Sequence, residues 1–434
     1  MSLHSSGVDP TPVGNHDPEE RLRALFDRGT TRPLASGVLA ARGRVDGTLV
    51  IGFACLDGAL GAAGGRTVVA AVDAAVRERV PVIGLWHCTG TGLAEGVPGL
   101  DAAGQVYAAT VRASGRIPQI SVLLGPVTAA AAYVPPLSDV VIATPGRSPA
   151  DPVADLLAAD PDDALAEARR LALFLGAQGR FSPDDVAPGG TTGVPLNTLV
   201  PTTTDRAYDV RPLVRALLDA PGTELHATRA TNIVTTLGRL AGRTIGVLAN
   251  NPLRLGGSLD PAAAEKAARF VRMCNALGIP LVVVADSPGL LPGTGHTDTT
   301  QRGAKLLHAF AEAVVPRVTL ITRRVYGGAY LAMNSRSLGA TTVLAWPTSR
   351  IAAIGPNAAV DLRHRRALAA TPPAGRELLR ARLLADELAS TSASRAAEQG
   401  LIDDIVLPQH TRRRIAETLA ATPAGRGNHT NMPL

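Results

Sequence analysis

Residues 280–347 read PLVVVADSPGLLPGTGHTDTTQRGAKLLHAFAEAVVPRVTLITRRVYGGAYLAMNSRSLGATTVLAWP. Two apolar runs, 281–285 and 318–321, have the length and composition of buried strands, and each leads into a glycine-rich turn. The segment 304–315 between them has the apolar spacing of a helix. The stretch therefore predicts a strand–loop–helix–strand–loop unit. Its glycines lie at strand ends, where backbone N–H groups can point at a ligand oxygen.

Length and composition indicate a large folded protein. The chain has 434 residues, of which 46% are apolar, enough to bury a core in about two domains. No apolar run reaches the roughly 18 residues of a membrane span, and the N-terminus lacks the apolar core of a signal peptide, so we expect a cytoplasmic protein. Cys55, Cys88 and Cys274 form no C-x-x-C pair, so we expect neither a disulfide framework nor a metal site.

The net charge of +6 comes almost wholly from arginine, since Lys266 and Lys305 are the only lysines. The arginines are scattered and aromatic residues make up only 3% of the chain, so nucleic-acid binding is not expected. A positive surface would attract a polyanionic small molecule or an acidic carrier domain. A compositional bias of the genome explains the same excess of arginine.

The two halves of the chain repeat the same blocks in the same order. Matching segments contain Gly43 and Gly238, then Pro81 and Pro280, then Pro118 and Pro316. A nearly constant offset predicts two copies of one fold. Each copy alternates strands and helices, which is typical of the α/β class with helices covering the strands.

The composition divides the chain into five segments. We expect a disordered arm at 1–18, an N-terminal domain at 19–145, a connector at 146–209, a C-terminal domain at 210–421 and a tail at 422–434. A hairpin is predicted within 37–54 and a helix at 163–178. Two surface helices are predicted at 372–389 and 411–421, with a short strand between them.

Common catalytic motifs are missing from the sequence. It contains no G-x-S-x-G, H-E-x-x-H or P-loop motif. Two backbone turns remain, Ala129–Ala131 and Gly327–Ala329, each placed after an apolar strand and before a helix. Free N–H groups at such a turn can stabilise an oxyanion without an ionisable side chain. Tight helix–strand packing through small residues would give the same pattern.

Several longer segments carry a resemblance to a known family. They are NNP at 250–252, KAARFVRMC at 266–274, SPGLLPGT at 287–294, RGAKLL at 302–307, YGGAYLAMNS at 326–335, LAWPTSRIAAIG at 344–355 and AAEQGLIDDIVLPQHTR at 396–412. With these segments the sequence resembles the carboxyltransferase (β) subunit of biotin-dependent acyl-CoA carboxylases, of the propionyl-CoA and acetyl-CoA carboxylase type. The resemblance runs from about residue 19 to residue 412. It implies a tandem duplication of two crotonase-like (ClpP/crotonase) domains.

The resemblance also implies a reaction. In that family carboxybiotin breaks down to CO₂ and a biotin enolate, the enolate removes the α-proton of the acyl-CoA, and the carbanion attacks CO₂. The protein then supplies oxyanion holes and positioning. For this chain, the implied activity is transfer of CO₂ from carboxybiotin on a separate carrier protein to the α-carbon of a short acyl-CoA or a related acyl thioester.

Site residues follow by resemblance. Gly327, Gly328 and Ala329 are implied as the biotin-side oxyanion hole, and Ala129 and Ala130 as the acyl-side one. Leu331 falls where the family tunes acyl-chain length. The further substrate contacts implied are Gly58, Ala59, Gly90, Glu95, Tyr133, Pro292, Gly293, Thr294 and Gly355.

Partners are implied in the same way. The chain lacks the A-M-K-M context of a biotinylated lysine, so the resemblance implies a separate biotin carboxyl carrier and a separate ATP-dependent biotin carboxylase subunit. Binding of ATP or of a metal by this chain is not expected. The family's active site lies between the first domain of one subunit and the second domain of another. That arrangement implies an oligomer, usually a hexamer of paired subunits, or a mixed oligomer.

The first half departs from the family pattern. Where the family has G-P-C-A-G-G-A, residues 125–131 read GPVTAAA, and Gly92 stands where the family has an arginine. A family segment after Thr144 is missing, and the loop after Thr294 is shorter. Three explanations are open: a non-standard acceptor, a decarboxylase-like or transcarboxylase-like activity, or a non-catalytic subunit of a carboxylase complex.

Two other groups near strand ends have simpler interpretations. His87 and Cys88 are adjacent on a strand and point to opposite faces, so a nucleophilic pair is not expected. We expect Asp286 to order its turn by accepting hydrogen bonds from backbone N–H groups.

Overall fold

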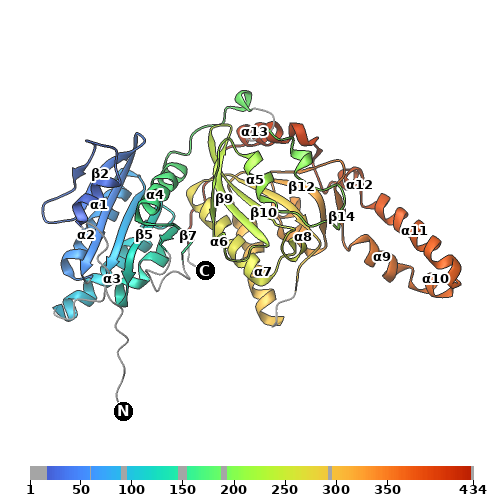
Figure 1. The fold of residues 1–434 in the computed structure, drawn as a ribbon, viewed down its shortest axis with the longest axis horizontal. Helices are drawn as coiled ribbons and strands as arrows, with labels where there is room; N and C mark the ends of the chain where they lie inside the picture. Colours follow the sequence, from blue (N-terminus) through green and yellow to red (C-terminus); the bar gives the residue numbers. More distant parts are fainter. Residues whose placement is uncertain are drawn as a thin grey trace, which may run out of the picture.

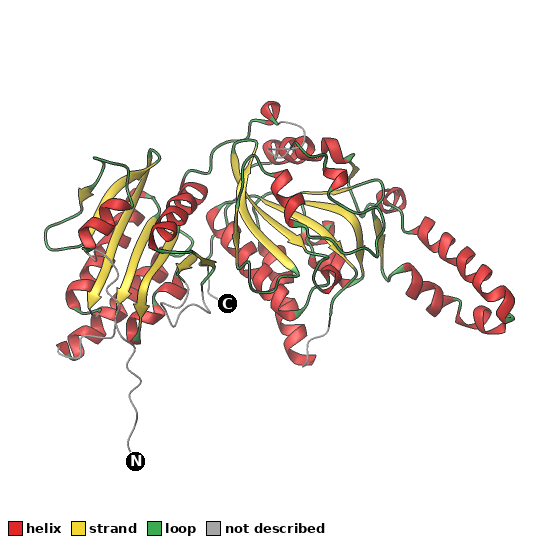
Figure 2. Cartoon of the chain, in the orientation of Figure 1, coloured by secondary structure: helices red, strands yellow, loops and turns green. Residues whose placement is uncertain are grey.

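The computed structural model describes residues 17–58, 60–88, 95–144, 154–186, 193–291 and 296–431. They form two α/β units side by side along the long axis of the molecule, each built on its own sheet (Figure 1). Helices cover the faces of both sheets (Figure 2). The predicted α/β class is confirmed.

The first sheet follows the chain from one edge to the other. Its strands are β1 (Arg32–Pro33), β2 (Ala40–Val45), β3 (Thr48–Gly58), β4 (Val82–Cys88), β5 (Gln119–Val127), β6 (Val140–Ala143) and β7 (Leu156–Leu157), in that order. β2 and β3 are antiparallel and form the predicted hairpin, whose turn residues Asp46 and Gly47 both have positive φ, as a two-residue hairpin turn requires. From β3 to β7 the pairing is parallel.

Helices cover both faces of this sheet. One face carries α2 (Ala62–Glu78) and α3 (Val97–Ala113), which share a core with Phe53 and Trp86. The other face carries α1 (Pro18–Ala24) and α4 (Pro161–Gly176). Strands buried on both faces read as continuous apolar runs rather than alternating ones, which is why their position was predictable.

The second sheet repeats this plan. Its order is β15 (Asp404–Ile405), β13 (Thr342–Ala345), β12 (Arg317–Tyr326), β11 (Leu281–Ser287), β10 (Arg243–Asn250), β9 (Ile233–Leu240) and β8 (Thr223–Leu225), and β14 (Arg350–Ala352) pairs with the end of β12. β9 and β10 are antiparallel, whereas β10 to β13 are parallel. β2 to β6 and β9 to β13 therefore have the same order and direction, as the sequence repeat predicts.

The helices of the second unit also repeat the plan. One face is covered by α6 (Pro261–Leu277) and α7 (His296–Glu312), which pack against each other as α2 and α3 do. The other face is covered by α5 (Arg211–Leu217) and α13 (Thr411–Ala421). Beyond β14, the helices α9 (Pro356–Arg363), α10 (Arg365–Ala370) and α11 (Pro373–Ser390) project as an arm (Figure 1), followed by α12 (Ala393–Glu398).

The predicted connector contributes to the packing of both units. β7 pairs with β6, and α4, which is the helix predicted at 163–178, contacts both β5 and β9. Side chains of α4, including Leu171 and Leu175, belong to a core cluster that continues into the second unit. This part of the connector therefore joins the two sheets by burying apolar surface.

The C-terminal tail also links the two units. The Arg426 guanidinium donates to the carbonyls of Gly115 and Arg116 in the first unit, at 2.8 and 2.9 Å, and to Ala276 O in the second, at 2.9 Å. Asn431 Nδ2 donates to the buried Asp139 carboxylate at 2.9 Å. The polar composition of the tail gave no indication of this packing.

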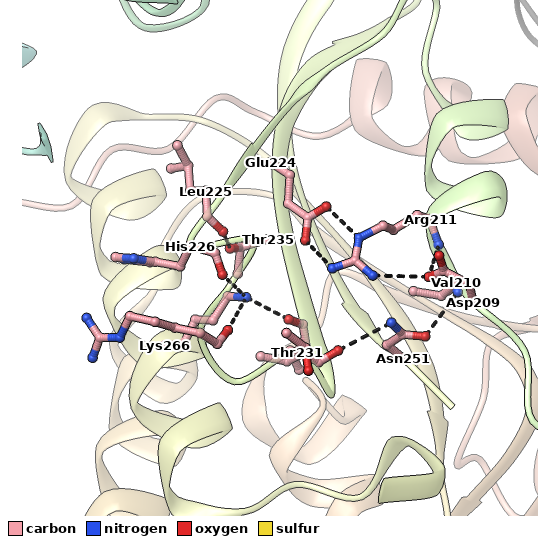
Figure 3. Close-up of polar contacts among 12 residues, drawn as sticks. Asp209, Val210, Arg211, Glu224, Leu225, His226, Thr231, Thr235, Asn251 and Lys266 are labelled. Carbon is pink, nitrogen blue, oxygen red and sulfur yellow. Dashed lines mark hydrogen bonds and ion pairs between the residues drawn. The ribbon is translucent and has the colours of Figure 1, made fainter. Parts of the chain in front are cut away.

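Lys266 of α6 holds the loop between β8 and β9 (Figure 3). Its side chain is buried, and Nζ donates to the carbonyl oxygens of His226, Arg229 and Ile233 at 2.9, 3.0 and 2.8 Å. All three donors of the ammonium are therefore used inside the protein. Burial lowers the pKa of Lys266 to about 8, from an ordinary value of 10.5.

We predict that Lys266→Met destabilises the fold by about 3 kcal/mol, because three buried carbonyls lose their donor. The native pKa is lower than the unfolded one, so unfolding takes up a proton between about pH 8 and pH 10.5. Wild-type stability should therefore rise across that window. Urea unfolding at several pH values measures both effects, and Lys305→Met serves as the exposed control. A pH slope that persists in Lys266→Met would assign the titration to another group.

Candidate functional site

The turn at the end of β12 is built on a glycine in the left-handed region. Gly327 has φ 56° and ψ −137°, and its N–H donates to Ala352 O of β14 at 2.9 Å. The short helix α8 (Gly328–Ala332) begins at the next residue. The N–H groups of Gly328 and Ala329 precede any carbonyl of that helix that could accept them. Gly327 therefore shapes the turn, and the N–H groups of the next two residues have no carbonyl acceptor within α8.

There is little room for added side-chain atoms at this turn. A Cβ at Gly328 would lie 2.7 Å from Leu290 Cδ1, and one at Gly327 would lie 3.1 Å from Ala353 O. Ala329 is fully buried in the core. Tyr330 OH donates to Leu401 O at 2.9 Å and fixes α8 against the body of the domain.

A cavity of about 970 Å³ opens beside this turn. Tyr326, the residue before Gly327, lines it, and so does Gly355 at the start of α9. Leu331 lies on the outer side of α8 and is 46% exposed. Thr203, Asp205, Pro288, Arg324 and Arg350 also line this cavity.

A buried ion pair ties one wall of the cavity to the sheet. Arg323 Nε donates to Asp286 Oδ2 at 2.7 Å, and Tyr208 OH donates to the same oxygen at 3.0 Å. Arg323 Nη1 also donates to Thr203 O and Arg206 O, both at 2.7 Å. The prediction that Asp286 accepts hydrogen bonds from backbone N–H groups is wrong. The donors to its Oδ2 are the guanidinium of Arg323 and the hydroxyl of Tyr208.

The turn at the end of β5 also contains a residue with positive φ. Ala129 has φ 52°, close to that of Gly327, and begins the 3₁₀ helix η2 (Ala129–Tyr133). Ala131 is fully buried, like Ala329. By this equivalence Ala130 and Ala131 correspond to Gly328 and Ala329 of the second turn, whereas the sequence-based prediction named Ala129 and Ala130.

Two tyrosines lie against this turn. Tyr107 OH donates to Ala130 O at 2.5 Å, and its ring meets that of Tyr133 edge-on, with centroids 6.5 Å apart. Tyr133 is 70% exposed. Thr128 N–H donates to Cys88 O at 2.9 Å and ties the turn to β4.

Ala129 occupies a backbone conformation that favours glycine. We predict that Ala129→Gly stabilises the fold by about 0.5–1 kcal/mol, because removing Cβ relieves the left-handed strain and outweighs the added chain entropy. Ala130→Gly is the matched control, and its φ is not positive. It should lower stability by about 0.5–1 kcal/mol. Chemical denaturation of both variants checks the sign. A loss of stability in Ala129→Gly would contradict the strain argument.

Two of the other predicted site residues, Gly58 and Glu95, lie in the described part of the first unit. Gly58 is exposed at the end of β3, with φ 154°. Glu95 Oε2 accepts the Ala62 N–H at 2.7 Å, so this carboxylate caps the start of α2. Ala59, Gly90, Pro292, Gly293 and Thr294 lie outside the described residues.

His87 and Cys88 end β4 with different surroundings. Cys88 is buried and its thiol donates to Cys55 O at 3.4 Å. The His87 imidazole lies over Gly125, where an added Cβ would approach within 2.7 Å of the ring. The ring and the thiol thus face different environments, as the strand alternation predicts.

The chain does not bring the two turns together. β5 lies in the first sheet and β12 in the second (Figure 1). β8 to β11 lie between β12 and the edge near the first unit, where His226 N–H donates to Asp155 O. The two turns therefore lie in different units of the chain.

Comparisons with known proteins agree with this duplication. The carboxyl transferase domain family matches residues 17–150 and 150–429. The chain is 46% identical to the biotin-dependent acetyl-/propionyl-coenzyme A carboxylase beta6 subunit of Mycobacterium bovis, over 98% of this chain and 99% of that protein. It is also 46% identical to the propionyl-CoA carboxylase beta chain of Rhodococcus erythropolis, over 100% and 99%.

A solved structure shares the whole architecture. The transcarboxylase 12S structure, described as a hexamer with methylmalonyl-coenzyme A bound, superposes with a TM-score of 0.85 at 29% identity. The match covers 96% of this chain and 92% of that one. In the described part of the chain, no helix is long and apolar enough to cross a membrane.

The fold and the paired turns define a tandem crotonase-like enzyme. The chain belongs to the carboxyl transferase domain family, as a carboxyltransferase subunit of the biotin-dependent acyl-CoA carboxylase type.

Proposed function

We propose that the chain transfers CO₂ from carboxybiotin on a separate carrier protein to the α-carbon of a short acyl-CoA. The observation that carries this proposal is the equivalence of the two turns. Each follows the same strand of the repeat, starts at a residue with φ near 55° (Gly327 at 56°, Ala129 at 52°) and continues into a short helix.

The second turn is the biotin side. The N–H groups of Gly328 and Ala329 bind the ureido oxygen of biotin, and Tyr326 and Gly355 line the adjoining cavity of about 970 Å³. A volume of that size accommodates a small bicyclic ring with its tether. Bound carboxybiotin supplies the CO₂ that is transferred. The protein donors stabilise the negative charge that the ureido oxygen gains when CO₂ leaves.

The first turn is the acyl side. Here the N–H groups of Ala130 and Ala131 hold the thioester oxygen, on which charge accumulates when the α-proton is removed. The Cβ of Ala129 constrains this turn but deletes no donor, so the alanines are compatible with activity. Tyr107 fixes the peptide of Ala130 through its carbonyl. Gly58 and Tyr133 border the approach of the acyl-CoA, and Glu95 supports it by capping α2.

One active site uses two subunits. The two turns lie in different sheets of the chain, and transcarboxylase 12S is described as a hexamer. We propose that the first turn of one subunit meets the second turn of another, with the carrier protein and a biotin carboxylase as further partners.

Label transfer tests the proposal. Carrier protein loaded with ¹⁴C-carboxybiotin is mixed with the chain and with acetyl-, propionyl-, butyryl- or octanoyl-CoA, and acid-stable label is counted. We expect transfer to the short acyl-CoAs, because the aliphatic Leu331 suits a small apolar acyl group. Discharge of label without any acid-stable product would indicate a decarboxylase-like activity. No discharge at all would favour a non-catalytic subunit.

A further inference from the structure

Two arginines lie side by side at the wall of the biotin-side cavity. β12 and β14 pair in parallel with Arg324 opposite Arg350, Val325 opposite Ile351 and Tyr326 opposite Ala352. Val325 and Ile351 belong to the core, whereas Arg324, Arg350 and Tyr326 line the cavity. This alternation is the ordinary consequence of strand geometry.

Among the described residues, no carboxylate forms an ion pair with either arginine. The only anionic side chain among those lining the cavity is that of Asp205, which is exposed. The nearby Asp286 is already paired with Arg323. Two cations in register repel each other, and adjacent like charges across a sheet are unfavourable. An anion in the cavity would remove that repulsion.

The two arginines differ in the hydrogen bonds that their guanidinium groups make within the protein. Arg350 Nη1 donates to Leu388 O at 2.7 Å, which fixes its guanidinium. Among the described residues, Arg324 makes no ion pair, and its buried Nε has no hydrogen-bond partner. The side chain of Arg324 also lines the cavity, so the end of its guanidinium can be reached by a ligand there. Arg324 is therefore the guanidinium available to a bound anion.

We propose that Arg324 binds the carboxylate of carboxybiotin. Arg324 lies two residues before Tyr326, and Gly328 lies two residues after Tyr326. One strand end therefore carries both a cation and the backbone donors proposed for the ureido oxygen. The carboxylate is attached to a ureido nitrogen, next to that oxygen. A planar guanidinium matches a carboxylate in geometry and charge. Arg324 then distinguishes the carboxylated carrier from the uncarboxylated one.

The inference rests on the proposed biotin-side site, and a binding experiment separates the two. Biocytin and N-carboxybiocytin, the latter kept in the cold at alkaline pH, are titrated against the intact oligomer by equilibrium dialysis. In the wild type we expect tighter binding of the carboxylated form. Arg324→Gln should weaken that form by about tenfold or more and leave biocytin unchanged, because a charged hydrogen bond is lost only with the carboxylate. Arg324→Lys should retain part of the preference.

Arg376→Gln is the matched control. Arg376 lies on the exposed arm and donates to Thr371 O at 3.2 Å, so its loss changes the net charge equally without touching the cavity. If the wild type and Arg324→Gln each bound biocytin and N-carboxybiocytin with equal affinity, the inference would be overturned. The label-transfer experiment would still test the proposed function independently. Equal weakening of both forms in a folded Arg324→Gln oligomer would also overturn the inference, since that result describes a general packing role.

Discussion

Gly328→Pro, combined with Leu290→Ala, is expected to lower kcat for carboxyl transfer by about 100- to 1,000-fold. The proline removes one of the two backbone donors of the biotin-side turn, and loss of a single oxyanion-hole donor has an effect of this size. The second substitution is needed because any Cβ at position 328 approaches Leu290 Cδ1 to 2.7 Å. Proline is compatible with the first position of a helix, so α8 should still form.

The control for this prediction is Gly328→Ala with Leu290→Ala. It adds the same Cβ and makes the same space, but keeps the N–H. We expect its kcat to stay within about tenfold of the wild type, because the donor that contributes to transition-state binding is retained. Label transfer under saturating acyl-CoA measures both variants. Equal activity of the proline and alanine variants would show that this N–H does not serve as a donor.

Arg323→Ala is expected to lower the free energy of unfolding by about 3–5 kcal/mol. Asp286 is fully buried and loses its cation. Its carboxylate must then stay charged without a partner or take up a proton, and either outcome costs free energy. The carbonyls of Thr203 and Arg206 lose their donor in the same variant. Since these residues belong to the segment that forms a wall of the cavity, we also expect a higher KM for the carboxylated carrier.

The pH dependence of Arg323→Ala provides an internal check. Burial raises the pKa of Asp286, and Arg323 opposes that rise in the wild type. Without Arg323 the folded state holds a proton that the unfolded state releases, so stability should fall as pH rises above the ordinary aspartate range. The double variant Arg323→Gln, Asp286→Asn should be less destabilised than Arg323→Ala and show a flat profile. A flat profile in Arg323→Ala itself would contradict the account.

Much of the fold was predictable because parallel strands buried on both faces are continuous apolar runs. The runs at 281–285 and 318–321 became β11 and β12, and their repeats in the first half became β4 and β5. The repeat also predicted the equivalence of Ala129 and Gly327, which the positive φ values of both residues now support. These features depend on local composition and order, which a single sequence records directly.

The cavity wall depended on contacts between distant segments. Tyr208 and Asp286 are 78 residues apart, and no local pattern connects a tyrosine of the predicted connector with that carboxylate. β14 is three residues long, too short to stand out as an apolar run. Its pairing with β12 is what places Arg350 beside Arg324. Contacts between short segments that are far apart in the chain could therefore not be predicted from the sequence.

Subunit complementation tests most directly whether the two turns form one active site. Two inactive variants are needed: Gly328→Pro with Leu290→Ala on the biotin side, and Ala130→Pro with Ala129→Gly on the acyl side. They are dissociated together, reassembled and assayed for label transfer. If each site combines turns from two subunits, mixed oligomers should regain about a quarter of wild-type activity, as random pairing predicts. Mixed oligomers as inactive as either parent would contradict the account.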